Sequence, residues 1–149
     1  MDPTVVDDSE DLYRSIRANT DEYSYQDGKL VFSSSAFDDR FKKPSVDRSS
    51  LRPIPADARI NADDGVAKVL TVEVRRSCKI PIIRNGVPIG EYAVDAVHKP
   101  IENDQSLPDN LAHCHIECNP IIESGSRFKK LKAALANLAS QHGFVVPPS

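Results

Sequence analysis

One long amphipathic helix is predicted near the end of the chain, over residues 127–142, after a series of β-prone segments. Its apolar residues recur at helical spacing and form one stripe, made by Phe128, Leu131, Leu135 and Leu138. Gly143 follows at the position where helices commonly end. Strands in the middle and a single helix at the end indicate an α+β fold. We therefore predict an antiparallel or mixed β-sheet of about five to six strands, with this helix packed on one face.

Two glycine-containing turns separate β-prone segments and predict tight hairpins, at Asp27-Gly28 and at Asn85-Gly86. The second hairpin contains prolines, which cannot donate ladder hydrogen bonds, so we expect it at a sheet edge. The longest strand is predicted at residues 66–75, which are rich in β-branched side chains, and another at residues 91–98. Near the N-terminus two alternatives stay open, a short helix capped by Ser9 or a strand beginning at Leu12.

The 149 residues are predicted to form a single domain, with a loose acidic lead-in at residues 1–9 and a short tail at residues 145–149. A net charge of −3 argues against general nucleic-acid binding, and no apolar run is long enough to span a membrane. The acidic N-terminus lacks the apolar region of a signal peptide. Three cysteines, an odd number, do not make a secreted disulfide framework. Together these features predict a cytoplasmic protein.

The chemically richest stretch is residues 107–120, which holds two of the four histidines and two of the three cysteines. If residues 111–119 form a strand, alternate side chains share a face of the sheet. One face then carries Leu111, His113, His115, Glu117 and Asn119. The other face carries Ala112, Cys114, Ile116 and Cys118.

This His-x-His-x-Glu row has two interpretations. Side chains two residues apart on a strand are about 7 Å from each other, so His113, His115 and Glu117 would reach one divalent transition metal such as zinc, iron or nickel. His98 would add a ligand if its strand pairs with this one. In the structural alternative the histidines lie on a solvated face, Cys114 and Cys118 belong to the core, and no cofactor is bound.

Cationic residues suggest two further sites. Cys78 lies beside Arg75, Arg76 and Lys79, and neighbouring cations lower the pKa of a thiol. Guanidinium groups bind phosphate and carboxylate, so an anion site would form if four arginines converged, namely Arg14, Arg48, Arg75 and Arg76. An ordinary cysteine and surface ion pairs are the alternatives. The sequence contains no P-loop, G-x-G-x-x-G, G-x-S-x-G or C-x-x-C motif.

Four segments together resemble a family of short, largely uncharacterised bacterial proteins. They are Leu-Tyr-Arg at residues 12–14, Ser-Ser-Ala-Phe at 34–37, Ser-Val-Asp at 45–47 with Leu51, and a late part with Val-His-Lys-Pro at 97–100 and Leu-Pro-Asp-Asn-Leu-Ala-His at 107–113. The family pattern reads leucine-tyrosine-arginine, serine-serine-x-x-phenylalanine, serine-valine-aspartate, histidine-x-proline and proline-x-asparagine-x-alanine-histidine. The resemblance covers residues 12–118, with a longer insert between the two late parts, and it leaves the C-terminal helix outside.

The resemblance implies that distant segments contribute to one polar pocket or one hydrogen-bonded network. It selects eight positions, which are Arg14, Ser34, Ser35, Phe37, Asp47, His98, Asn110 and His113. Small size, mild acidity and the lack of a complete catalytic motif favour a non-catalytic accessory or interaction protein with a protein partner, such as an immunity or defence-system component. Its pocket would be built from Arg14, Asp47, His98 and His113.

Two other hypotheses use the same residues. In the first the protein is an enzyme in which His113 or His98, with Asp47 nearby, acts as general acid or base. Its pocket would be built by Arg14, Ser34, Asp47, His98 and His113, and Arg14 would hold a phosphate-like group of the ligand. The ligand-binding candidates are Arg14, Ser34, Ser35 and Asn110. In the second it is a metal-binding domain centred on His113, His115 and Glu117.

Overall fold

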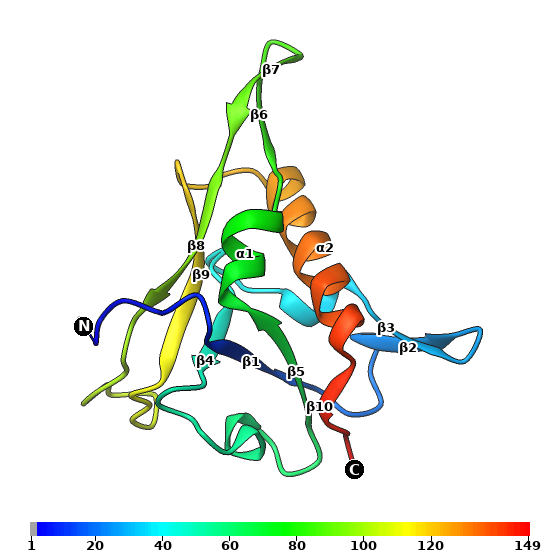
Figure 1. The fold of residues 1–149 in the computed structure, drawn as a ribbon, viewed down its shortest axis with the longest axis vertical. Helices are drawn as coiled ribbons and strands as arrows, with labels where there is room; N and C mark the ends of the chain where they lie inside the picture. Colours follow the sequence, from blue (N-terminus) through cyan, green and yellow to red (C-terminus); the bar gives the residue numbers. More distant parts are fainter. Residues whose placement is uncertain (1–2) are drawn as a thin grey trace.

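The computed structural model describes residues 3–149, and its centre is a six-stranded sheet with the strand order β10-β5-β1-β4-β9-β8 (Figure 1). Every neighbouring pair in this sheet is antiparallel. The strands are β1 Asp11–Ile16, β4 Ser45–Arg48, β5 Gly65–Leu70, β8 Ala93–His98, β9 His113–Asn119 and β10 Phe144–Val146. The predicted α+β fold with an antiparallel sheet is confirmed.

Two α-helices pack on one face of the sheet, α1 (Thr71–Ser77) and α2 (Gly125–His142), and both contact β5. The stripe predicted for the last helix is buried, since Phe128, Leu131, Leu135 and Leu138 are at most 8% exposed. Gly143 follows α2 with a φ of 72°, the left-handed conformation that suits glycine. The core lies between these helices and the inward side chains of the strands. We call this side of the sheet the core face.

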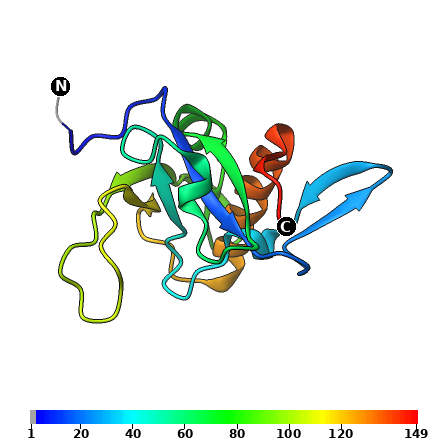
Figure 2. The ribbon, with the colours of Figure 1, turned by 90° about the horizontal axis from the view of Figure 1, so that it is seen from below.

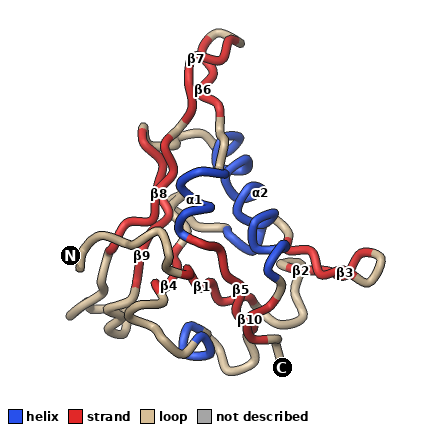
Figure 3. The backbone as a smooth tube through the Cα atoms, viewed as in Figure 1, coloured by secondary structure: helices blue, strands red, loops and turns tan. Residues whose placement is uncertain are grey.

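The two predicted hairpins are both present, and each forms a separate two-stranded sheet. The first pairs β2 (Tyr23–Gln26) with β3 (Lys29–Phe32), and the second pairs β6 (Pro81–Arg84) with β7 (Val87–Glu91). Both central residues of each turn have positive φ, as a two-residue type I′ turn requires. The second hairpin does not extend the main sheet, and both hairpins project from the body of the molecule (Figures 1 and 3).

Two strand predictions need correction. The segment 66–75 is not one strand, because β5 ends at Leu70 and α1 begins at Thr71. The Glu73 carboxylate accepts a hydrogen bond from the backbone N–H of Leu70 at 3.0 Å, and the Thr71 hydroxyl donates to the carbonyl of Glu10 at 2.9 Å. These contacts favour a helical turn over β propensity. Near the N-terminus the helix alternative is wrong, because β1 is a strand.

The chain ends are more ordered than the sequence predicts. Instead of a loose lead-in, residues 3–9 are held by Arg48, which donates to the carbonyls of Pro3 at 2.7 Å and Val5 at 3.0 Å. Val6 is 1% exposed. At the other end, β10 pairs with β5, so the predicted tail begins within a strand. Residues 1–2 lie outside the described residues.

The second face of the sheet is covered by loops and by the short 3₁₀ turn η2 (Pro55–Ala58), with no α-helix among residues 3–149 packed there. A loop over residues 99–112 extends from the end of β8 and returns to β9 (Figure 2). Another 3₁₀ turn, η1 (Ser34–Phe37), contacts α2. No helix within residues 3–149 has the length and apolar character needed to cross a membrane.

Candidate functional site

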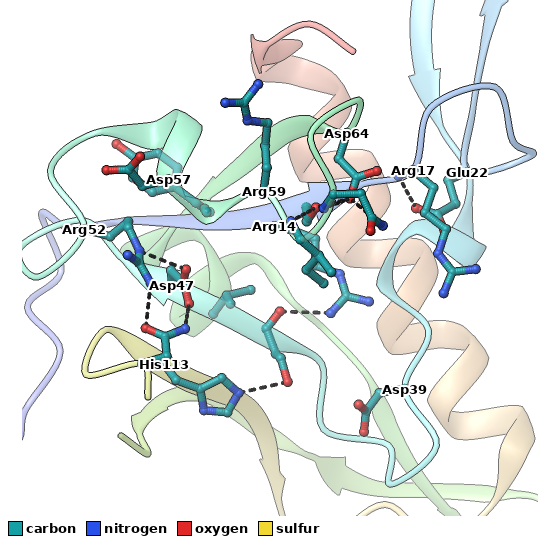
Figure 4. A pocket seen from close by; sticks show the side chains of 18 of the residues that line it. Arg14, Arg17, Glu22, Asp39, Asp47, Arg52, Asp57, Arg59, Asp64 and His113 are labelled. Atoms are coloured by element: carbon teal, nitrogen blue, oxygen red, sulfur yellow. Dashed lines mark hydrogen bonds and ion pairs between the residues drawn. The ribbon is translucent and has the colours of Figure 1, made fainter. Parts of the chain in front are cut away.

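A groove of about 840 Å³ lies on this second face, between η2 and the loop 99–112 (Figure 4). Its lining includes five arginines and seven carboxylates, so it is strongly polar. We call it the groove, and its floor consists of Tyr13, Ser15, Ser45, Asp47, Asn110 and His113.

Strand register explains why distant segments meet in this floor. Asp47 of β4 is opposite Tyr13 of β1 on one side and opposite His113 of β9 on the other. Residues directly opposite each other in an antiparallel pair point to the same face. The register therefore brings Tyr13, Asp47 and His113, from three of the four sequence segments selected above, into the groove floor.

Asp47, Arg52 and Asn110 form a closed triangle of hydrogen bonds (Figure 4). Arg52 Nε donates to Asp47 Oδ2 at 3.2 Å, and Arg52 Nη2 donates to Asn110 Oδ1 at 2.8 Å. Asn110 Nδ2 donates to Asp47 Oδ1 at 2.8 Å. Because each partner fixes the other two, the floor is rigid at this point. This cluster also joins the loop 99–112 to β4.

His113 is held through both ring nitrogens. Nδ1 lies 2.7 Å from the carbonyl oxygen of Lys99, and Nε2 lies 3.0 Å from the hydroxyl oxygen of Ser45. A carbonyl oxygen only accepts, so Nδ1 carries the proton, and in the neutral ring Nε2 accepts from Ser45. A general base needs a free nitrogen facing its substrate. His113 is thus a fixed polar residue of the groove floor.

Arg14 is a structural clamp. It lies on β1 with the core-facing Leu12 and Ile16, and its guanidinium extends past the sheet. Its nitrogens donate to the carbonyls of Ala36 at 2.9 Å, Ser45 at 2.9 Å and Asp38 at 2.8 Å. Burial lowers the pKa of Arg14. Arg14 also lines the groove, and a backbone carbonyl accepts from each of its three nitrogens. That Arg14 binds a ligand stays a prediction.

The serine motif also serves the fold. Phe37 is fully buried beside the Arg14 guanidinium, which lies 5.8 Å from the ring centre. Ser35 lines the groove, but its hydroxyl is 2.7 Å from that of Ser33. Ser34 does not belong to the groove lining.

His98 lies on the core face, away from the groove. It is opposite Cys114 in the β8–β9 pair, whereas His113, the next residue back along β9, points to the groove. Its Nδ1 is buried and has no hydrogen-bond partner among the described residues. Burial and the nearby charge of Arg48 lower the pKa of His98. The structure therefore brings three of the five residues predicted for a catalytic pocket into the groove, Arg14, Asp47 and His113, and leaves Ser34 and His98 outside its lining.

The His-x-His-x-Glu row lies on one face of β9, as its alternation predicts. The rings of His113 and His115 are 4.9 Å apart, and His115 Nδ1 is 3.7 Å from Glu117 Oε1. Burial, followed by the neighbouring His113, lowers the pKa of His115. Across residues 3–149, no three His, Cys, Asp or Glu side chains are grouped so that they could hold a metal ion. The bonds that engage both nitrogens of His113 also compete with metal ligation.

The four arginines proposed for an anion site do not converge. Arg48 is buried in an ion pair with Glu10 at 2.8 Å, and Arg75 pairs with Asp8 and Asp95, both at 2.7 Å. The proposed reactive Cys78 also needs correction. Burial raises the pKa of its thiol to about 12, so the neighbouring cations do not activate it.

Sequence reasoning missed Tyr13, Arg52 and the pair Ser15–Asp64. The Ser15 hydroxyl donates to Asp64 at 2.8 Å and accepts from the backbone of Ile60 at 3.0 Å, which fixes the loop after η2 over the floor. The available signal was the alternation of β1, which places Tyr13 and Ser15 opposite the core side chains Leu12 and Ile16.

No protein-family model, curated protein or solved structure matches this chain. What the groove can do follows from its own geometry.

Proposed function

We propose that the protein is a non-catalytic binding protein whose groove receives part of a partner protein. The observation that carries this proposal is the state of the floor, in which Asp47, Asn110 and His113 are all engaged in hydrogen bonds. A catalytic site keeps an acid, a base or a nucleophile available to its substrate. A floor of mutually fixed polar groups is instead a preorganised surface, which reduces the cost of binding.

The lining favours a protein segment over a drug-like small molecule. Pockets for small molecules are mostly apolar with a few polar groups, whereas this groove has five arginines and seven carboxylates in its lining. Charged side chains at an interface set specificity and accelerate association. A partner with complementary charges would use both properties.

The wider setting of this proposal comes from the sequence alone. We propose a bacterial accessory role, with immunity and defence systems as the setting, in a cytoplasmic location. Small size, mild acidity and the four-segment resemblance support it, and membership of that bacterial family stays a prediction.

A photo-crosslinking residue placed in the groove tests the proposal. Ile60 lines the groove and is 82% exposed, so p-benzoylphenylalanine at this position should leave the fold intact. Lys130, exposed on α2 and outside the groove lining, is the matched control position. In cells of the native host, irradiation should give one discrete protein adduct from position 60 and none of that size from position 130. No adduct from position 60, or the same adduct from both, overturns the proposal.

A further inference from the structure

Tyr13 is the one floor residue whose polar group is left without a partner. The residue is 7% exposed, and its ring packs with Ala58 and Val66. Its hydroxyl makes no hydrogen bond with any described residue, although a buried tyrosine hydroxyl usually finds a partner. Among the described residues, the only fully buried side-chain polar atom without a partner is His98 Nδ1, so the Tyr13 hydroxyl opens into the groove.

Arg52 is a second donor in the groove lining. Tyr13 is opposite Asp47, and Arg52 is bound to that same Asp47. Arg52 uses Nε and Nη2 in the triangle, which leaves Nη1 without a partner among the described residues. The Tyr13 hydroxyl stays protonated at neutral pH, because burial and then the nearby Asp11 raise its pKa. The groove lining therefore offers two donors, from the residue opposite Asp47 and from the arginine bound to Asp47, and both match acceptor oxygens on a ligand.

The charges of the groove lining indicate which chemical group supplies the acceptor oxygens. Asp47 already neutralises Arg52, so the pair of donors has little net positive charge to attract a phosphate or a carboxylate. The lining as a whole has two more carboxylates than arginines, which opposes an anionic ligand. Asp57, exposed at η2 in the groove lining, has no ion pair with the described residues and is free to bind a cation (Figure 4).

We propose that Tyr13 and Arg52 donate hydrogen bonds to main-chain carbonyls of an extended basic segment of the partner protein, with Asp57 pairing a lysine or arginine of that segment. This inference rests on the proposed function and names the chemistry of the segment that the groove receives. Neutral carbonyls suit these two donors, because Asp47 already balances the charge of Arg52. The basic side chain of the segment is attracted by the excess of carboxylates in the groove lining.

The inference is tested by titrating the isotope-labelled full chain with a short peptide of alternating lysine and serine, and with its glutamate–serine counterpart, in amide NMR. The lysine peptide should shift the side-chain amide signal of Asn110 and bind about ten-fold more tightly than the glutamate peptide. Tyr13→Phe keeps the ring and its packing, and should weaken the lysine peptide about three- to ten-fold. The matched control is Tyr25→Phe, on the β2–β3 hairpin and 66% exposed, which should change nothing.

Salt separates the two parts of the contact. Asp57→Asn should also weaken binding of the lysine peptide, and this loss of affinity should disappear at high ionic strength, because salt screens an exposed ion pair. The loss of affinity caused by Tyr13→Phe should persist. Equal binding of the two peptides, no binding of the lysine peptide, or an unchanged affinity in Tyr13→Phe overturns the inference. Crosslinking from position 60 tests the proposed function independently of the peptide titration. An adduct there, together with a failed peptide titration, rejects the basic segment and retains the partner.

Discussion

The two faces of the sheet are formed by the same strands but differ in how completely their charged groups are paired. On the core face the charged pair Glu10 and Arg48 is almost fully enclosed, at 6% and 4% exposed. The three side-chain nitrogens of Arg48 donate four hydrogen bonds, two to Glu10 and two to backbone carbonyls. On the groove face Asp47 is engaged too, but Arg52 Nη1, the Tyr13 hydroxyl and the Asp57 carboxylate have no partner among the described residues. Charge on the core face is fully paired within the chain, whereas part of the charge on the groove face is not.

This contrast predicts where substitutions will act. Changes on the core face should lower the free energy of unfolding, because they leave a buried group without its partner. Changes at the groove rim should alter binding and leave stability nearly constant. A protein in which both faces respond alike would contradict the division.

The largest effect is expected for Arg48→Met. Removing one partner of a buried ion pair leaves an uncompensated charge on Glu10, which costs about 3–5 kcal/mol. The free energy of unfolding from urea titration measures this loss. Arg76→Met is the matched control, because the Arg76 side chain is 77% exposed and its substitution should cost less than about 0.5 kcal/mol. Equal losses in the two variants would show that the Arg48 pair is not a stabilising contact.

Acid should weaken the core face next. Burial alone would raise the pKa of Glu10, but hydrogen bonds from Arg48 and Ser50 outweigh it and lower the pKa to about 2. The folded state thus binds this proton less readily than the unfolded chain, whose Glu10 has the ordinary value of 4.5. The stabilisation is complete above the ordinary pKa, and it is lost as the pH falls toward about 2, by about 3 kcal/mol in total.

Urea titrations across this acid range measure the slope, and Glu10→Gln provides the comparison. A neutral side chain at this position cannot titrate, so the free energy of unfolding of the variant should vary less between pH 5 and pH 2. An unchanged slope would place the acid sensitivity in other carboxylates.

Arg14→Lys should have a smaller effect, at the point where the two faces meet. Lysine cannot reproduce the fork that binds three carbonyls at once, so a loss of about 2 kcal/mol in the free energy of unfolding is expected. Arg17→Lys is the control, since the Arg17 side chain is 76% exposed. If both variants unfold at the same urea concentration as the parent protein, the Arg14 clamp contributes no stability.

How far the sequence predicted this arrangement depends on the range of the forces involved. The alternation over residues 111–119 correctly placed Cys114 and Ile116 in the core and His113 on the other face, because a strand has a period of two. The turns at Asp27-Gly28 and Asn85-Gly86 were also predictable, since positive φ at both positions is a local requirement. Local patterns therefore recovered the sheet and its hairpins.

The errors came from contacts between distant segments. Thr71 begins a helix in a β-branched segment because its hydroxyl binds the carbonyl of Glu10, far away in the sequence. Arg14 and His98 matched a predicted pocket by residue type. Register, however, places His98 on the core face, and Arg14, which does line the groove, binds carbonyls of η1 and of Asp38 after it. A local sequence pattern predicts neither the strand register nor the path of the chain after β3.

The smallest expected effect is the lack of reaction of the native cysteines. Burial raises the pKa of Cys78 and Cys114 to about 12 and that of Cys118 to about 11. Each of the three thiols is therefore almost entirely protonated at pH 8. Ellman's reagent should therefore react slowly with the folded protein and fully after denaturation. Asp57→Cys places a thiol on the groove rim and should add one fast-reacting group. Rapid labelling of Cys78 or Cys114, the two buried cysteines, would show that the core face opens, and would remove the distinction between the two faces.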